Sequence, residues 1–160
     1  MEYQIIENFL EKELFYKVKK SCFEEKCQDN LNWFRNNVVK PEDENFYFCH
    51  LAFHEYNMSP IFPIMKPILN KLNVKSLKRI KLNFYPSTEK IIKHEEHEDY
   101  PFSHKGALLS LNTCDGGTYL NDNFVNSVEN KVLLFNPSQK HSSTTTTKKE
   151  GRANISFNYF

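Results

Sequence analysis

The stretch Lys93-His94-Glu95-Glu96-His97-Glu98-Asp99-Tyr100 decides how the fold of this chain is interpreted. Side chains two residues apart in an extended strand point the same way, so His97 and Asp99 would face one interior while Glu98 faces outward. One imidazole and one carboxylate from this segment, joined by a second imidazole from elsewhere, would supply three ligands on one face of a metal ion. Such a set suits non-haem Fe(II), because three coordination positions stay open for substrate groups and O2.

The same stretch has two other interpretations. His94 and His97 would share one face of a helix, as in zinc proteases, but the pattern His-Glu-Glu-His is one residue short of HExxH, and Pro101 follows closely. A charged run of this kind is also commonly a solvated surface, and that interpretation would prevail if the run stood alone. The second imidazole therefore has to be sought further along the chain.

His141 is the best candidate for that imidazole, because it follows a buried-looking strand at 131–135 that closes in a turn. Arg152 lies eleven residues further on and begins a segment that alternates between polar and apolar side chains. The polar face holds Arg152, Asn154, Ser156 and Asn158, and the apolar face holds Ala153, Ile155, Phe157 and Tyr159. Strand statistics leave two possibilities open for the polar face, an inward functional surface or an ordinary solvent-facing one.

The order of the predicted elements favours an α+β fold that is mainly β. Amphipathic spacing predicts one helix within 11–23 and a second beginning at Ser59-Pro60. Strands are predicted at 3–7, 45–54, 77–85, 91–99, 107–111, 118–120, 131–135 and 152–160. Helices followed by a run of strands indicate a sandwich or barrel, and 160 residues predict a single domain spanning 1–160.

Composition narrows the class of protein. A formal net charge of +1, with no long basic run, argues against a dedicated nucleic-acid or membrane-surface binder. The four cysteines form no CxxC pair, the first residues carry charge where a signal peptide needs an apolar core, and no apolar run could span a bilayer. We therefore expect a cytoplasmic protein. Glycine is scarce, so the pair Gly116-Gly117 predicts a turn or a close approach of backbones.

Five ordered motifs give the chain a resemblance to a known family. They are Asn83-Phe84-Tyr85-Pro86, His97-Glu98-Asp99, Gly116-Gly117-Thr118-Tyr119-Leu120, Leu134-Phe135-Asn136-Pro137-Ser138 leading to His141, and Arg152 through Phe160. The chain resembles the Fe(II)/2-oxoglutarate-dependent dioxygenases over about residues 77–160, half of its length, and in particular the prolyl-4-hydroxylase-like branch with its short phage-type members. The resemblance implies a single oxygenase domain with a double-stranded β-helix (jelly-roll) core and N-terminal helices packed on one sheet.

The resemblance also implies roles for individual residues. His97, Asp99 and His141 would bind Fe(II), and Arg152 would pair with the distal carboxylate of 2-oxoglutarate, where its planar fork suits bidentate bonding. Tyr85, Ser156 and Asn83 would contribute further contacts to this co-substrate. The implied cofactors are Fe(II), 2-oxoglutarate and O2, with ascorbate as a reductant. Relatives often carry a co-substrate tyrosine on the strand that follows the HxD motif, whereas this chain has Ala107-Leu108-Leu109-Ser110-Leu111.

The implied reaction is hydroxylation of a C–H bond with release of succinate and CO2. A prolyl residue of a protein or peptide is the first choice of substrate. A nucleic-acid dealkylase is the alternative within the superfamily, although the last strand lacks the second arginine expected for it. A non-catalytic jelly-roll binding module is the third possibility. Residues 24–58, with Trp33, Phe34, Arg35 and the aromatics at 46–48, are expected to form a substrate lid, although such aromatic stripes are more often core.

Overall fold

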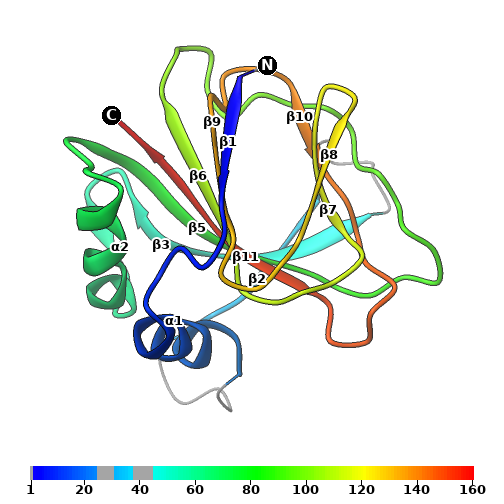
Figure 1. Ribbon diagram of the computed structural model, residues 1–160, viewed down its shortest axis with the longest axis horizontal. Coiled ribbons are helices and arrows are strands. Elements are labelled where there is room, and N and C mark those ends of the chain that lie inside the picture. Colours follow the sequence, from blue (N-terminus) through cyan, green and yellow to red (C-terminus); the bar gives the residue numbers. More distant parts are fainter. Residues whose placement is uncertain (1, 25–30, 38–44) are drawn as a thin grey trace.

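The computed structural model describes residues 2–24, 31–37 and 45–160. Its strands form a large sheet and a small one, which face each other across the interior of the molecule (Figure 1). The strands are β1 (Tyr3–Ile6), β2 (Phe34–Asn37), β3 (Phe46–His54), β4 (Asn57–Met58), β5 (Leu77–Tyr85), β6 (Lys105–Ser110), β7 (Gly117–Leu120), β8 (Asn123–Asn126), β9 (Val132–Phe135), β10 (His141–Ser143) and β11 (Arg152–Tyr159). The mainly β prediction is confirmed.

The large sheet has the order β1-β9-β6-β11-β5-β3-β2, with β4 added beside β3, and the small sheet has the order β10-β7-β8. All pairings between these strands are antiparallel. Strands far apart in sequence thus lie side by side, as expected for a jelly roll. The pairing of β11 with β5 matters most for function, because it aligns Arg152 with Tyr85, Asn154 with Asn83, Ser156 with Lys81, and Asn158 with Arg79.

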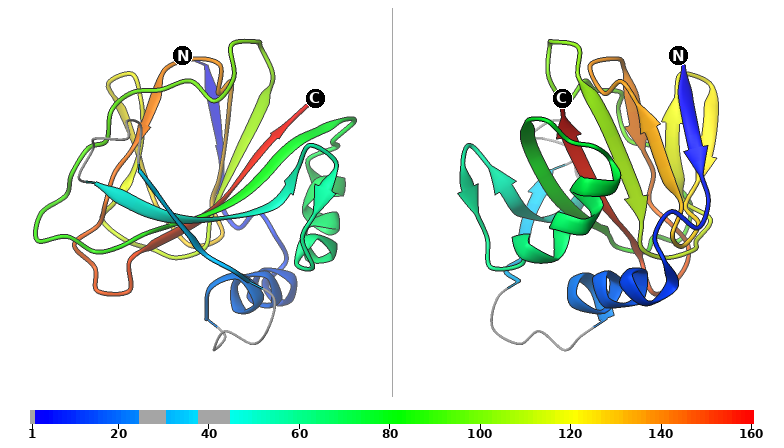
Figure 2. Two further views of the ribbon diagram at one scale, coloured as in Figure 1. Left: turned by 180° about the vertical axis from the view of Figure 1, so that it is seen from behind. Right: turned by 60° about the vertical axis from the view of Figure 1, so that its left-hand side comes forward.

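The helical elements cover the outer face of the large sheet (Figures 1 and 2). They are α1 (Lys12–Lys19), which runs into the π-helical turn η1 (Lys20–Glu24), and the 3-10 turn η2 (Phe62–Met65), which runs into α2 (Lys66–Lys71). Val18 of α1 and Ile68 of α2 pack into one apolar core with Ile80 of β5 and Ile155 of β11. The helices therefore cover one face of the large sheet and leave its other face directed at the small sheet.

This arrangement settles the alternation in β11. Ala153, Ile155 and Phe157 lie in the helix-covered core, while the polar face is turned toward the small sheet. Arg152, Asn154 and Asn158 are each only 1% exposed, so this polar face is an interior surface and not a wet one. An interior row of polar groups needs specific partners, since burying them unpaired is unfavourable.

The segment between β5 and β6 differs from prediction. A continuous strand was expected at 91–99, but this region makes only isolated bridges, from Lys93 to Thr144 and from His97 to His141. The segment therefore runs beside β10 as an irregular edge of the small sheet. The second helix was expected to begin at Ser59-Pro60. It begins at Phe62 instead, as a 3-10 turn, and the backbone N–H of Phe62 donates to the carbonyl oxygen of Ser59.

The predicted close approach at Gly116-Gly117 is confirmed. A Cβ atom on Gly116 would lie 2.3 Å from the carbonyl oxygen of Thr145 and 3.2 Å from Cδ of Arg152, so a side chain there would push β7 away from the interior arginine. Among the helices of the described residues, none is long and apolar enough to cross a membrane.

Candidate metal centre

His97, Asp99 and His141 form a compact group of potential metal ligands between the two sheets. One ligand atom from each lies within 4.8 Å of those of the others. Two backbone hydrogen bonds bring the segments together, from His97 N–H to His141 O at 2.9 Å and from His141 N–H to His97 O at 3.0 Å. A two-residue offset then places Asp99 beside both rings, with 4.0 Å between His97 Nε2 and Asp99 Oδ1. Residues separated by more than forty positions therefore meet as the sequence predicted.

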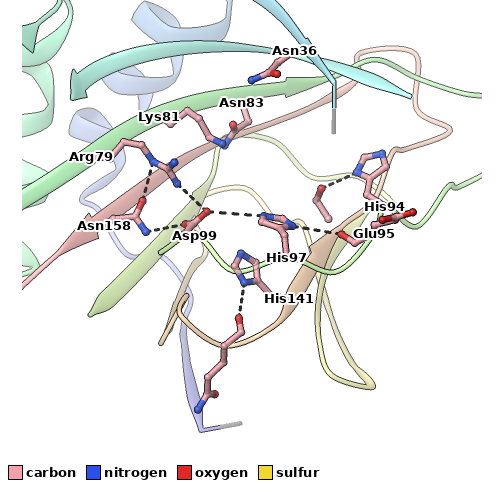
Figure 3. Close-up of polar contacts among 12 residues, drawn as sticks. Asn36, Arg79, Lys81, Asn83, His94, Glu95, His97, Asp99, His141 and Asn158 are labelled. Carbon is pink, nitrogen blue, oxygen red and sulfur yellow. Dashed lines mark hydrogen bonds and ion pairs between the residues drawn. The ribbon is translucent and has the colours of Figure 1, made fainter. Parts of the chain in front are cut away.

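The two imidazoles are prepared to coordinate a cation. Nδ1 of His141 lies 2.9 Å from the carbonyl oxygen of Gln139, which can only accept, so Nδ1 carries the proton and Nε2 keeps a free lone pair (Figure 3). Nδ1 of His97 lies 3.5 Å from the carbonyl oxygen of Glu95, a longer contact of the same kind. Burial, together with the neighbouring His141, lowers the pKa of His97 to about 4. The ring of His97 is therefore neutral at physiological pH, as a ligand must be.

Both oxygens of Asp99 are held by neighbours. Arg79 of β5 places a guanidinium nitrogen 2.9 Å from Oδ1, and Asn158 of β11 donates to Oδ2 at 2.8 Å (Figure 3). Arg79 also donates from Nε to Oδ1 of Asn158 at 3.1 Å, which closes a triangle of contacts. Burial alone would raise the pKa of Asp99, but Arg79, Lys81 and the Asn158 hydrogen bond outweigh it and hold that pKa well below its usual range.

A further histidine fixes the orientation of Asn158. The amide nitrogen of Asn158 donates to Asp99 and also lies 3.0 Å from Nε2 of His104, which must accept. Nδ1 of His104 accordingly donates to the carbonyl oxygen of Phe102 at 2.8 Å. A line of hydrogen bonds thus runs from a backbone carbonyl through His104 and Asn158 to the carboxylate.

Arg152 is a buried cation in the same interior. It is 1% exposed and donates to the carbonyl oxygen of Thr144 at 3.1 Å and to Oγ1 of Thr118 at 2.9 Å, while its Nε has no hydrogen-bond partner. Its guanidinium carbon lies 5.1 Å from the centre of the Tyr85 ring. Within the described part of the chain no carboxylate pairs with Arg152. A buried guanidinium left in this state is stabilised by an anionic ligand.

A cavity connects Arg152 with the three candidate ligands. Its walls come from both sheets and are formed by Lys81, Asn83, Tyr85, His97, Asp99, Leu108, Thr118, Phe135, His141, Ser143, Arg152, Asn154 and Ser156. Every residue that the sequence assigned to the site therefore lines one cavity. The strand expected to carry a co-substrate tyrosine contributes Leu108 instead, so no hydroxyl reaches the cavity from that position.

The polar lining retains unused hydrogen-bonding capacity. Nδ2 of Asn83 donates to Oδ1 of Asn154 at 2.9 Å, whereas Oδ1 of Asn83 and Nδ2 of Asn154 have no partner. Tyr85 stacks with the rings of Tyr47 and His94, with centroid distances of 5.3 and 5.7 Å. The orphaned amide atoms and the buried Arg152 guanidinium, whose Nε has no hydrogen-bond partner, match a polar, anionic molecule, and two imidazoles with one carboxylate match Fe(II). The residues present therefore fit both implied groups.

Other side chains named from the sequence lie elsewhere. His94 donates or accepts at Ser143 Oγ, 2.8 Å away, and stacks on Tyr85, so it is not part of the ligand group. Trp33 packs edge-on against Phe84 on the helix-covered side of the sheet, so its indole belongs to the core and does not line the cavity. Residues 25–30 and 38–44 of the expected lid lie outside the described residues.

Several solved structures have a fold similar to that of this chain. The chain superimposes on an oxidoreductase of the 2OG-Fe(II) oxygenase family from Burkholderia pseudomallei with a TM-score of 0.71 at 10% identity, covering 98% of this chain and 84% of that one. The chain has the fold of the Fe(II)/2-oxoglutarate oxygenases. A prolyl hydroxylase from Trichoplax adhaerens, solved with a peptide of hypoxia-inducible factor, gives 0.63 at 15% identity over 99% and 83% of the two chains.

Further structures with this oxygenase fold include prolyl hydroxylases. A prolyl-4-hydroxylase from Pseudomonas putida gives a TM-score of 0.61 at 13% identity, covering 98% of this chain and 91% of that one. No family model and no curated protein matches the sequence. The oxygenase fold is thus shared with these proteins while nearly nine in ten aligned residues differ, so function has to be argued from the cavity.

The sequence did not single out Arg79, Asn158, Lys81 or Asn154 as site residues. A signal for Arg79 and Lys81 was present, because they alternate with Asn83 and Tyr85 along one predicted strand, and Asn154 and Asn158 lie on the polar face of the last strand. Because side chains alternate along a strand, assigning Tyr85 to the interior also places Asn83, Lys81 and Arg79 on the interior face. Only the pairing of β5 with β11 shows which of them meet the ligand group.

Proposed function

We propose that this chain is an Fe(II)- and 2-oxoglutarate-dependent dioxygenase that hydroxylates a C–H bond. One observation carries the proposal: two imidazoles, one carboxylate and a buried guanidinium line the same cavity, and among the described residues no carboxylate pairs with that guanidinium. The ligand group fits ferrous iron and leaves positions open. The guanidinium fits the distal carboxylate of a 2-oxo dicarboxylic acid.

Five residues would hold or orient the metal. His97, Asp99 and His141 would hold the metal, with Arg79 and Asn158 orienting the carboxylate of Asp99. When bound, the metal and the 2-oxo acid supply the chemistry by which O2 is used and succinate and CO2 are released.

Arg152 would anchor the distal carboxylate, with Asn83, Tyr85 and Ser156 completing the wall around the co-substrate. The ring of Tyr85, which stacks on Tyr47, lies beside the Arg152 guanidinium and would strengthen that pairing by limiting the access of water.

A prolyl residue of a protein or peptide is the substrate we propose. Support comes from the prolyl hydroxylases among the structures with the same fold, one of which was solved with a peptide. The last strand has no arginine after Arg152, whereas a nucleic-acid dealkylase would be expected to carry a second one there. The prolyl substrate is therefore preferred over an alkylated base.

The test begins with the reaction common to both substrates. Purified protein is incubated with Fe(II), 2-oxoglutarate, O2 and ascorbate, and succinate is measured in the absence of any substrate. We expect slow release of succinate by the wild type and none by Asp99→Ala; equal release by both would exclude the site. Proline-rich peptides and methylated oligonucleotides are then added separately, and mass spectrometry looks for a gained oxygen atom or a lost methyl group.

A further inference from the structure

A second cation, the partly buried Lys81, faces the same cavity. Lys81 lies on β5 between Arg79 and Asn83, on the face of the large sheet directed at His97, Asp99 and His141 (Figure 3). Its Nζ donates to the hydroxyl of Tyr47 at 3.3 Å. Within the described residues no carboxylate pairs with it, since Asp99 is already held by Arg79 and Asn158.

The position of Lys81 separates it from Arg152. Arg152 lies opposite Tyr85 in the register of the sheet, and Lys81 lies four residues before Tyr85 on the same strand. Four residues of strand span about 13 Å. The two cations therefore stand at different ends of the cavity, Arg152 at the far end and Lys81 at the end near Asp99. We therefore expect the carboxylate bound by Arg152 to leave Lys81 available for a different anion.

The balance of charge indicates what Lys81 meets. In the loaded cavity the formal charges of Arg79, Lys81, Arg152 and a ferrous ion exceed those of Asp99 and the two carboxylates of the 2-oxo acid. Lys81 and Arg152 would then leave the fully loaded cavity with an excess of positive charge. A buried excess of this kind is unfavourable unless a further anion enters. The prolyl substrate alone brings no such charge.

Resting on the proposed function, we propose that the primary substrate carries a carboxylate that pairs with Lys81, so the enzyme selects acidic substrates. The strand arrangement supports this, because Lys81 is adjacent to the metal ligands where a substrate C–H bond has to lie. Burial, with Arg79 nearby, lowers the pKa of Lys81 to about 8, as expected for an amine whose anionic partner has not yet arrived. In the substrate complex the carboxylate would hold the ammonium form.

The first experiment asks whether Lys81 serves the co-substrate instead. Protein loaded with Ni(II), which does not turn over, is titrated with N-oxalylglycine, a 2-oxoglutarate analogue. We expect Arg152→Met to weaken binding at least tenfold and Lys81→Met to change it by less than threefold. Lys105→Met, which removes an exposed lysine of β6 outside this cavity, is the matched control. A tenfold loss in Lys81→Met would overturn the proposal by assigning Lys81 to the co-substrate.

The second experiment probes the substrate position with N-oxalylglycine already bound. N-acetyl-L-proline is compared with N-acetyl-L-prolinamide, and N-acetyl-L-valine with its amide, so that each pair differs in one carboxylate. We expect the wild type, Lys105→Met and the charge-retaining Lys81→Arg to bind each acid at least tenfold more tightly than its amide, and Lys81→Met to lose this preference. Equal binding of acid and amide by the wild type, or a preference that survives in Lys81→Met, overturns the proposal.

The two experiments also separate this inference from the function on which it rests. If the wild type fails to bind N-oxalylglycine, or if Arg152→Met binds it normally, the proposed function fails and the inference fails with it. If N-oxalylglycine binds as expected but the acids have no advantage, the oxygenase proposal stands and only the acidic substrate is wrong.

Discussion

The guanidinium of Arg79 lies 2.9 Å from Oδ1 of Asp99, the carboxylate oxygen that also faces His97. Arg79 lies on β5, opposite Asn158 of β11. The amide of Asn158 donates to the second carboxylate oxygen of Asp99. Both side chains of the Arg79–Asp99 pair are mostly buried, with 15% and 10% of their surface exposed. The pair therefore fixes the direction in which the carboxylate presents its lone pairs, and it does so before any metal arrives.

Arg79→Met should weaken metal binding. Partners that orient a metal ligand typically contribute 10–100-fold to affinity, so we expect a loss in that range. The measurement is a competitive titration of Co(II) against a chromophoric chelator. Lys78→Met, on the neighbouring position of the same strand, is the control for loss of one positive charge. An affinity for Co(II) that Arg79→Met leaves intact would show that the ion pair has no part in positioning Asp99.

Arg152→Met should weaken binding of 2-oxoglutarate. Loss of one partner of a buried, hydrogen-bonded charge pair costs roughly 2–5 kcal/mol. The loss should be specific to the distal carboxylate, so we compare 2-oxoglutarate with 2-oxobutyrate, which lacks it, by calorimetry on Ni(II)-loaded protein. The wild type should strongly prefer 2-oxoglutarate and the variant should not. A preference of equal size in both proteins would remove Arg152 from the co-substrate site.

Lys81→Met should stabilise the protein when no metal or ligand is present. Burial lowers the pKa of Lys81 from 10.5 to about 8, so between these values the unfolded chain binds more protons and stability rises with pH. At pH 7 the folded state bears the full cost of a partly buried ammonium. We expect Lys81→Met to raise the free energy of unfolding by roughly 1–3 kcal/mol at pH 7, and by much less at pH 10.5. Urea denaturation at both pH values provides the measurement, and a destabilised variant at pH 7 would contradict the prediction.

His97 should make the metal-free protein sensitive to acid. Burial and His141 lower its pKa from 6.5 to about 4, so the stability it contributes is complete above pH 6.5 and is lost as the pH falls toward 4. Because about a third of the side chain is exposed, we expect a loss of roughly 1–2 kcal/mol over that window. Protonation of Asp99 reduces the free energy of unfolding only at still lower pH, because the pKa of Asp99 is held well below its usual range. The urea midpoints of the wild type and His97→Gln should converge as the pH falls from 7 to 4. If the two midpoints instead fall in parallel with pH, the acid sensitivity does not come from His97.

The residues that meet around the candidate metal could be predicted from sequence because each carries a short-range signal. His97 and Asp99 share a face by spacing alone, and His141 and Arg152 follow in a fixed order. Spacing could not decide whether the polar face of the last strand was wet, because that depends on which sheet covers it. The small sheet does so, and β10 within it was missed because His141-Ser142-Ser143 is short and polar.

The same local signals could not predict contacts between strands that are distant in sequence. The triangle of Arg79, Asn158 and Asp99 depends on the register of β5 against β11 and on the irregular path of residues 91–99, which local propensity predicted as a regular strand. The packing of Trp33 against Phe84 likewise follows from the helix-covered face of the sheet. Tertiary pairing, not residue type, determined each of these outcomes.

The most direct test of the account is the stoichiometry of metal binding. Wild type, Asp99→Ala, His141→Ala and His104→Ala are equilibrated with Co(II), and bound metal is measured per folded chain. We predict one tightly bound ion for the wild type, at least a hundredfold weaker binding for Asp99→Ala and His141→Ala, and a smaller loss for His104→Ala, because His104 reaches Asp99 through Asn158. Equal metal binding by the wild type and His141→Ala would contradict the central claim that these three side chains hold one ion.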